Sequence, residues 1–238
     1  MKVLLLADLH GVPPWYRWIT AQADEFDLVC IAGDLIDMFQ ATDRQMAFIR
    51  DEWLPAFVAT GVPLAVCSGN HDHSISIWLS HVPGDQIIRD GESRLVRFRN
   101  NESLVVTTCP YFGSFNARHP ATANLWQTGK TLAVKHRVLW LVLHHEPPPQ
   151  LSPDVVINEL SKLARCFTPD YVSCGHFHEG PEVLGRFATT ARSTVFFNAG
   201  ANPDALVPNH VVLDITSRTA EWHRTTSDGT AHSITLVL

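Results

Sequence analysis

The chain has 238 residues, of which 45% are hydrophobic and 18% charged, as in globular proteins with a sizeable core. Its net charge of -6 argues against a large nucleic-acid footprint, which would need a basic face. The first apolar run, Val3 to Ala7, is too short for a signal peptide or a membrane span, and no later run is long enough to cross a bilayer. The five cysteines include no C-x-x-C pair. We therefore expect reduced thiols and a cytoplasmic protein.

Helical and strand-like segments alternate through the first two thirds of the chain. The expected helices cover residues 14–26, 41–60 and 152–167, and two more strands are expected near 94–98 and 103–108. Pro14 and Ser152 are typical of helix starts, whereas Pro55 predicts a break. The alternation predicts βαβ units and a mostly parallel sheet.

The last third of the chain has a different pattern. Short strand-like runs separated by turn residues occur at 193–200, 209–217, 219–226 and 232–238. They predict an antiparallel sheet that completes the same domain. Because no linker interrupts the chain, we expect a single domain over residues 1–238.

Five strand-like runs end in carboxylate, amide or imidazole side chains. The runs are "VLLLADLH", "LVCIAGD", "PLAVCSGNHD", "VLWLVLHHE" and "DYVSCGHFH". Each ending taken alone is common in turns and helix caps. The carboxyl ends of parallel strands share one edge of a sheet, where ligands bind. We therefore expect these polar side chains to converge in one cleft.

The chemistry of these side chains indicates a metal site. Carboxylate, imidazole and amide groups without a thiolate favour Mn, Fe, Zn, Co or Ni over a structural cysteine-zinc site. The donors suffice for two metal ions that share one carboxylate. Two such ions can clamp the attacking and leaving oxygens of a phosphoryl displacement.

The spacing of the motifs carries a family resemblance. The chain contains "DLH" at 8–10, "GDLID" at 33–37, "GNHD" at 69–72, "LHHEPP" at 143–148 and "GHFH" at 175–178. These blocks, in this order, resemble the calcineurin-like metallophosphoesterase superfamily. The resemblance implies an α/β fold with two β-sheets in a sandwich flanked by helices, and a dinuclear site along one sheet edge.

The resemblance also implies ligands for two metal ions. The first ion would be held by Asp8, His10, Asp34 and His178. The second would be held by Asp34, Asn70, His176 and either His144 or His145. We favour His145, because family members often read His-x-Pro-Pro here. Asp34 would bridge the two ions.

The remaining implied roles concern phosphate hydrolysis. A hydroxide held by the metals would attack phosphorus, and His71 would contact the phosphate or protonate the leaving oxygen. Asp72 would orient His71, and Asp37 would do the same for a ligand. The loop over 111–120 contains Asn116, Arg118 and His119, which are candidates for substrate binding; an ordinary surface loop is the alternative.

The expected function is that of a metal-dependent phosphoesterase acting on a small phosphate ester. A small phosphodiester such as a cyclic nucleotide is favoured, because the chain has no room for a large cap domain. The alternatives are a nuclease or protein phosphatase of the same superfamily, or an inactive scaffold. The scaffold would be expected to lack ligands or the histidine at position 71, and the chain has both.

Overall fold

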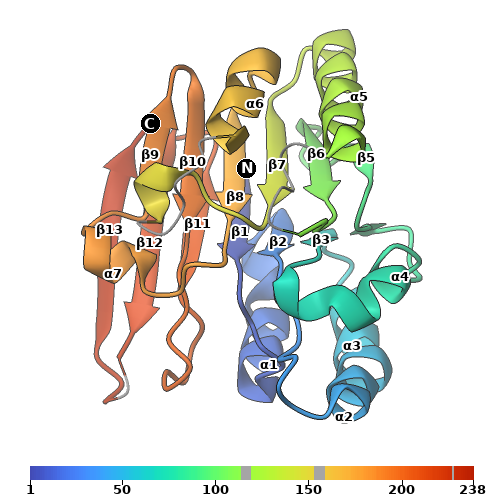
Figure 1. Ribbon diagram of the computed structural model, residues 1–238, viewed down its shortest axis with the longest axis vertical. Coiled ribbons are helices and arrows are strands. Elements are labelled where there is room, and N and C mark those ends of the chain that lie inside the picture. Colours follow the sequence, from blue (N-terminus) through green and yellow to red (C-terminus); the bar gives the residue numbers. More distant parts are fainter. Residues whose placement is uncertain (114–118, 153–158, 227) are drawn as a thin grey trace.

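Two β-sheets pack face to face, and helices cover the outer face of each (Figure 1). The computed structural model describes residues 1–113, 119–152, 159–226 and 228–238. The α/β sandwich implied by the resemblance is confirmed. Among the described residues, no helix has the length and apolar character needed to cross a membrane.

The first sheet has seven strands in the order β13-β12-β11-β1-β2-β3-β4. Its strands are β1 (Lys2–Leu6), β2 (Leu28–Ala32), β3 (Leu64–Cys67), β4 (Ile87–Ile88), β11 (His210–Asp214), β12 (Thr219–Thr225) and β13 (Ala231–Val237). Strands β1 to β4 are parallel, and β11 to β13 continue the sheet in antiparallel order.

The second sheet has six strands in the order β5-β6-β7-β8-β10-β9. Its strands are β5 (Ser93–Arg97), β6 (Ser103–Cys109), β7 (Trp140–His144), β8 (Tyr171–Cys174), β9 (Ala188–Ala191) and β10 (Thr194–Asn198). The four central strands are parallel, and β5 and β9 are antiparallel edges. The strands expected near 94–98 and 103–108 are thus confirmed.

Alternating side chains along the strands build separate apolar layers. Val3 and Leu5 of β1 face the second sheet, whereas Leu4 and Leu6 face the helices of the first. Helices α1 to α4 cover the first sheet, and α5 and α6 cover the second. The helices are α1 (Pro13–Gln22), α2 (Thr42–Ala47), α3 (Leu54–Val58), α4 (Ser76–Leu79), α5 (Pro120–His136), α6 (Glu159–Phe167) and α7 (Gly180–Leu184).

The segment predicted over residues 41–60 stays helical past Pro55. A π-helical stretch, Phe48–Trp53, joins α2 to α3, and the Leu54 N–H bonds to the Ile49 carbonyl five residues back. Pro55 has no N–H to donate and lies at the second residue of α3, directly after this wider turn. The expected break is therefore a local widening of the helix.

The prediction for the last third is only partly correct. Strands β11, β12 and β13 form antiparallel pairs, as expected. Strand β10 instead lies in the second sheet, parallel to β8, because its Phe196 and Phe197 pack into the two cores that flank that sheet. The helix predicted over 152–167 is described from Glu159 onward, and residues 153–158 lie outside the described part of the chain.

Candidate metal centre

The loops after β1 and β2 run side by side at one edge of the first sheet. The Asp8 N–H donates to the Gly33 carbonyl at 3.0 Å, and the His10 N–H donates to the Asp34 carbonyl at 2.9 Å. These bonds place the polar side chains of two motifs next to each other, as the shared strand edge predicts.

Two further hydrogen bonds tie the second sheet to this edge. His145 Nδ1 donates to the Ala32 carbonyl at 2.9 Å, and the His176 N–H donates to Asp8 Oδ1 at 2.9 Å. Within the second sheet, the Gly175 N–H donates to the His145 carbonyl at 2.9 Å and joins the loops after β7 and β8. The site is therefore assembled from loops of both sheets.

Several residues at this edge have a left-handed backbone. The φ angles are 55° at Asp8, 45° at His10, 51° at Asp34 and 72° at His176. This region costs a non-glycine residue about 1–2 kcal/mol. Such strain concentrates at functional sites, where the surrounding structure enforces it. The strained backbone conformations at these residues direct their side chains toward one point, and the rest of the fold offsets the free-energy cost.

Gly69 allows the third motif to approach Asp34. A Cβ atom at this position would overlap Asp34 Oδ1, although the φ of Gly69, -115°, is open to any residue. The glycine is therefore required by the close approach of the two loops. The neighbouring His71 N–H donates to the same Oδ1 at 2.8 Å.

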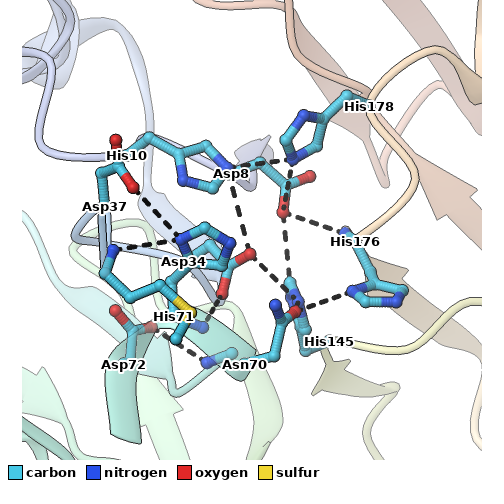
Figure 2. A network of polar contacts seen from close by, with 12 residues as sticks. Asp8, His10, Asp34, Asp37, Asn70, His71, Asp72, His145, His176 and His178 are labelled. Atoms are coloured by element: carbon cyan, nitrogen blue, oxygen red, sulfur yellow. Dashed lines mark hydrogen bonds and ion pairs between the residues drawn. The ribbon is translucent and has the colours of Figure 1, made fainter. Parts of the chain in front are cut away.

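The four residues expected to bind the first metal ion form one cluster (Figure 2). Each of Asp8, His10, Asp34 and His178 contributes a ligand atom, and these atoms lie within 4.8 Å of one another. His10 Nε2 lies 2.9 Å from His178 Nε2 and 3.9 Å from Asp34 Oδ2. His178 Nε2 lies 3.9 Å from Asp8 Oδ1.

The residues expected at the second ion converge beside this cluster. Asn70 Oδ1 lies 2.8 Å from His145 Nε2 and 2.7 Å from His176 Nδ1. Asp34 Oδ2 lies 3.4 Å from His145 Nε2. Figure 2 shows Asp34 between the two groups, in the place expected of a bridging ligand.

The structure distinguishes between His144 and His145, the two candidate metal ligands of the fourth motif. His145 contacts the cluster, and its Nδ1–H is held by a backbone carbonyl, which leaves Nε2 unprotonated toward the site in the neutral ring. His144 is fully buried in β7, and its Nδ1 lies 3.1 Å from the Glu146 carbonyl. Only His145 is among the converging side chains.

The polar groups of this cluster are suited to binding a cation. Asp8 Oδ2 is buried and has no hydrogen-bond partner within the described chain, an unfavourable state for a carboxylate. Burial raises the pKa of Asp8 and lowers the pKa of His10 and of His176 to about 4, so both rings are neutral near pH 7. Neutral imidazoles and unpaired carboxylate oxygens are metal donors.

His145 carries a positive charge that balances part of the negative charge of these carboxylates. Burial opposes a proton on its ring, but the carboxylates of Asp34 and Asp8 outweigh burial and raise the His145 pKa to about 9. His145 in turn holds the pKa of Asp34 well below its usual range, against the effect of burial. A cation bound here would replace that proton, as metals do when they bind histidine.

His71 stands at the rim of this centre, beside a third carboxylate. The Met38 N–H donates to His71 Nδ1 at 3.2 Å, and Asp37 Oδ1 lies 3.6 Å from the same nitrogen. In the neutral ring this leaves the proton on Nε2, the nitrogen open to a bound molecule. Asp37 therefore makes the contact with His71 that the sequence analysis expects of Asp72.

Asp72 instead holds backbone amides of two loops together. Its carboxylate accepts hydrogen bonds from the N–H groups of Gly69 at 2.9 Å and of Leu35 and Ile36 at 3.1 Å each. Burial and the charge of Asp34 raise its pKa to about 7 despite these donors. Its role in this structure is to fix the loop after β3 against the loop after β2.

Gln45 is a site residue that the sequence analysis misses. Its side chain accepts from the Asp37 N–H and donates to the Asp37 carbonyl, both at 2.8 Å. Gln45 lies in α2 and is only 8% exposed. No motif marks it, and the one signal in the sequence is a polar side chain at a buried helical position.

The loop expected over residues 111–120 is only partly described. Asn116 and Arg118 lie outside the described residues. His119 precedes α5, where its Nδ1 accepts a backbone N–H at 3.2 Å and its ring stacks on Phe112. In the described structure His119 thus serves as a helix cap.

Tyr111, in the same loop, reaches the centre. Its ring centroid lies 5.9 Å from that of His145, and its N–H donates to Ser68 Oγ at 2.9 Å. The sequence analysis singles out the loop but not this residue.

Solved structures share this fold across the whole chain. A dimetal phosphatase from Danio rerio aligns over 100% of this chain and 98% of its own, with a TM-score of 0.64 and 11% identity. The protein TT1561 of Thermus thermophilus aligns over 98% and 97%, with a TM-score of 0.55 and 11% identity. The purple acid phosphatase PPD1 of yellow lupin, Lupinus luteus, aligns over 99% of this chain and 53% of its own, with a TM-score of 0.58 and 12% identity. No curated protein sequence matches significantly.

The fold and the cluster define a two-sheet α/β protein with an aspartate- and histidine-lined candidate metal site. The family model described as calcineurin-like phosphoesterase matches residues 1–180, which include all five motifs. The chain belongs to the calcineurin-like phosphoesterase family.

Proposed function

We propose that the protein is a dinuclear metal-dependent phosphoesterase that hydrolyses a small phosphate ester, with a phosphodiester such as a cyclic nucleotide preferred. The observation that carries the proposal is the convergence of both expected ligand sets on Asp34. The donor set suits Mn, Fe, Zn, Co or Ni. Divalent ions bound here would lower the pKa of coordinated water and stabilise charge on the phosphoryl oxygens.

The protein's own groups supply orientation, a hydrogen-bond donor and a proton. In the neutral ring of His71, Nδ1 accepts from the Met38 N–H, so the Nε2–H can donate a hydrogen bond to a phosphoryl oxygen. In the imidazolium form, Nδ1–H would face Asp37 Oδ1, 3.6 Å away, and the ring can give its Nε2 proton to the leaving oxygen and become neutral. The backbone bonds at this edge keep His71 and Asp34 in fixed relation.

A cytoplasmic location also belongs to the proposal. The five cysteines are free thiols, and four of them are buried. Such thiols are typical of proteins in a reducing compartment.

The test is hydrolysis of bis-p-nitrophenyl phosphate and of p-nitrophenyl phosphate by metal-stripped protein, with Mn²⁺ added back. The matched variant is Asp34→Asn, which keeps the side-chain size and removes the charge. We expect metal-dependent turnover that falls at least about 100-fold in the variant, because even outer-shell partners of metals contribute about 10–100-fold. Faster hydrolysis of the diester would support the phosphodiester preference. Two bound metal ions without turnover with any of the five metals would support the inactive scaffold.

A further inference from the structure

A small cavity opens directly beside the candidate metal centre. Its volume is about 280 Å³, at the low end for ligand pockets, so it suits a small organic group rather than a polymer. Four of its lining residues belong to the centre and its rim, namely His10, Asp37, His71 and His178. The other lining residues are Val12, Trp15, Phe39, Gln40, Ala201 and Pro203.

Phe39 is held in this cavity although it is exposed to solvent. Its side chain is 83% exposed, and its ring lies edge-on to His71 with the centroids 5.5 Å apart. The Phe39 N–H donates to Asp37 Oδ1 at 2.9 Å, which fixes the residue to the carboxylate beside His71. An aromatic ring whose backbone is anchored in this way, and which contacts His71 while most of its surface stays exposed, offers a planar group a stacking surface.

The charge of the cavity defines what it can bind. None of the described residues that line it is Lys or Arg. Its carboxylate, Asp37, already accepts from the Phe39 N–H and from Gln40 Nε2, the latter at 2.9 Å. A second phosphate would find no Lys or Arg partner among these residues. An uncharged group enters without the cost of burying an unpaired charge.

We propose that this cavity is a leaving-group subsite that binds a planar, uncharged ring stacked on Phe39. The inference rests on the proposed function, because the ring is attached to a phosphoryl group held at the metal centre next to His71. The substrate class is then a phosphate ester of an aromatic or nucleobase-bearing group. Phe39 determines the specificity for the leaving group, because it contributes to binding the planar ring of the substrate.

The test measures binding of two phosphonates that resist hydrolysis and differ only in the organic group. Phenylphosphonate and methylphosphonate are titrated into Mn²⁺-loaded protein by isothermal calorimetry. The proteins compared are the wild type, Phe39→Ala, Phe39→Tyr and Ile77→Ala. Ile77 is 79% exposed and lies outside the cavity, so Ile77→Ala controls for loss of an exposed apolar side chain.

We expect Phe39→Ala to weaken phenylphosphonate binding roughly three- to tenfold, the range of an aromatic pair, and to change methylphosphonate binding less than twofold. Phe39→Tyr should keep the preference for the phenyl compound, and Ile77→Ala should leave both affinities unchanged. Equal affinities for both phosphonates in the wild type and in Phe39→Ala would overturn the subsite and leave the phosphoesterase standing. Binding of neither phosphonate, together with no ester hydrolysis, would overturn the proposed function and the subsite with it.

Discussion

Removal of the Gln45 side chain tests whether a buried clamp holds the rim of the centre. In Gln45→Ala the N–H and the carbonyl of Asp37 lose their partners, both of which lie at 2.8 Å. A neutral hydrogen bond contributes about 1 kcal/mol net, so the free energy of unfolding should fall by about 2 kcal/mol. For a chain of this size, that corresponds to a melting temperature lower by about 4–8 °C.

The Gln45→Ala substitution should also lower the rate of phosphate-ester hydrolysis. Asp37 and the Met38 N–H both contact His71, so a loosened Asp37 misplaces that ring. We expect a roughly tenfold loss of turnover, because misplacement costs less than the 10²–10⁴-fold contributed by a general acid. Bound metal should stay at the wild-type amount.

The assay pairs urea unfolding, followed by circular dichroism, with hydrolysis of p-nitrophenyl esters. Gln40→Ala is the matched control, because Gln40 also donates to Asp37 but only from an exposed position. Its loss should change the free energy of unfolding by less than about 0.5 kcal/mol. The reasoning is refuted if both variants unfold at the same urea concentration as the wild type.

Three other outcomes are expected. His71→Gln should lower turnover about 10²–10⁴-fold while metal analysis finds the wild-type content. Gly69→Ala should reduce the bound metal measured by mass spectrometry, because the added methyl group overlaps Asp34 while the backbone conformation suits alanine. Burial lowers the pKa of His210 to about 4, below its unfolded value of 6.5, so the unfolded chain binds the proton more tightly. Buried neutral His210 therefore contributes fully to the free energy of unfolding above pH 6.5. As the pH falls from 6.5 to 4, this contribution decreases by about 3 kcal/mol. Urea unfolding of His210→Phe should not show this decrease.

The sequence predicts the position of the site better than the details of its contacts. Polar residues that directly follow strands, such as Asp8 and His176, are brought together because parallel strands share an edge. Asp37, and not Asp72 as expected, contacts His71, while Asp72 accepts hydrogen bonds from backbone amides. Which of the two carboxylates contacts His71 depends on how the loops after β2 and β3 pack against each other, and the spacing of the motifs does not specify this packing.

Two other features could not be predicted from the sequence, namely the sheet to which a strand belongs and the contacts between residues of different loops and helices. The run that forms β10 is apolar on both faces and fits either sheet, so only tertiary packing places it beside β8. Gln45 contacts Asp37 from α2, and Phe39 contacts His71 from the loop after β2; no motif in the sequence specifies either contact. By contrast, the helix start near Pro14 and the alternation of side chains along strands follow from the backbone itself, and these predictions hold.

The assembly of the centre from both sheets has a consequence for the unfolded chain. His10 and His178 are separated by 168 residues, and their Nε2 atoms lie 2.9 Å apart. A cation held by both would close a chain loop of that length, as a disulfide does. By the chain-entropy relation for cross-links, closure of such a loop disfavours the unfolded state by about 5 kcal/mol. A bound ion would thus act as a removable cross-link between the two sheets.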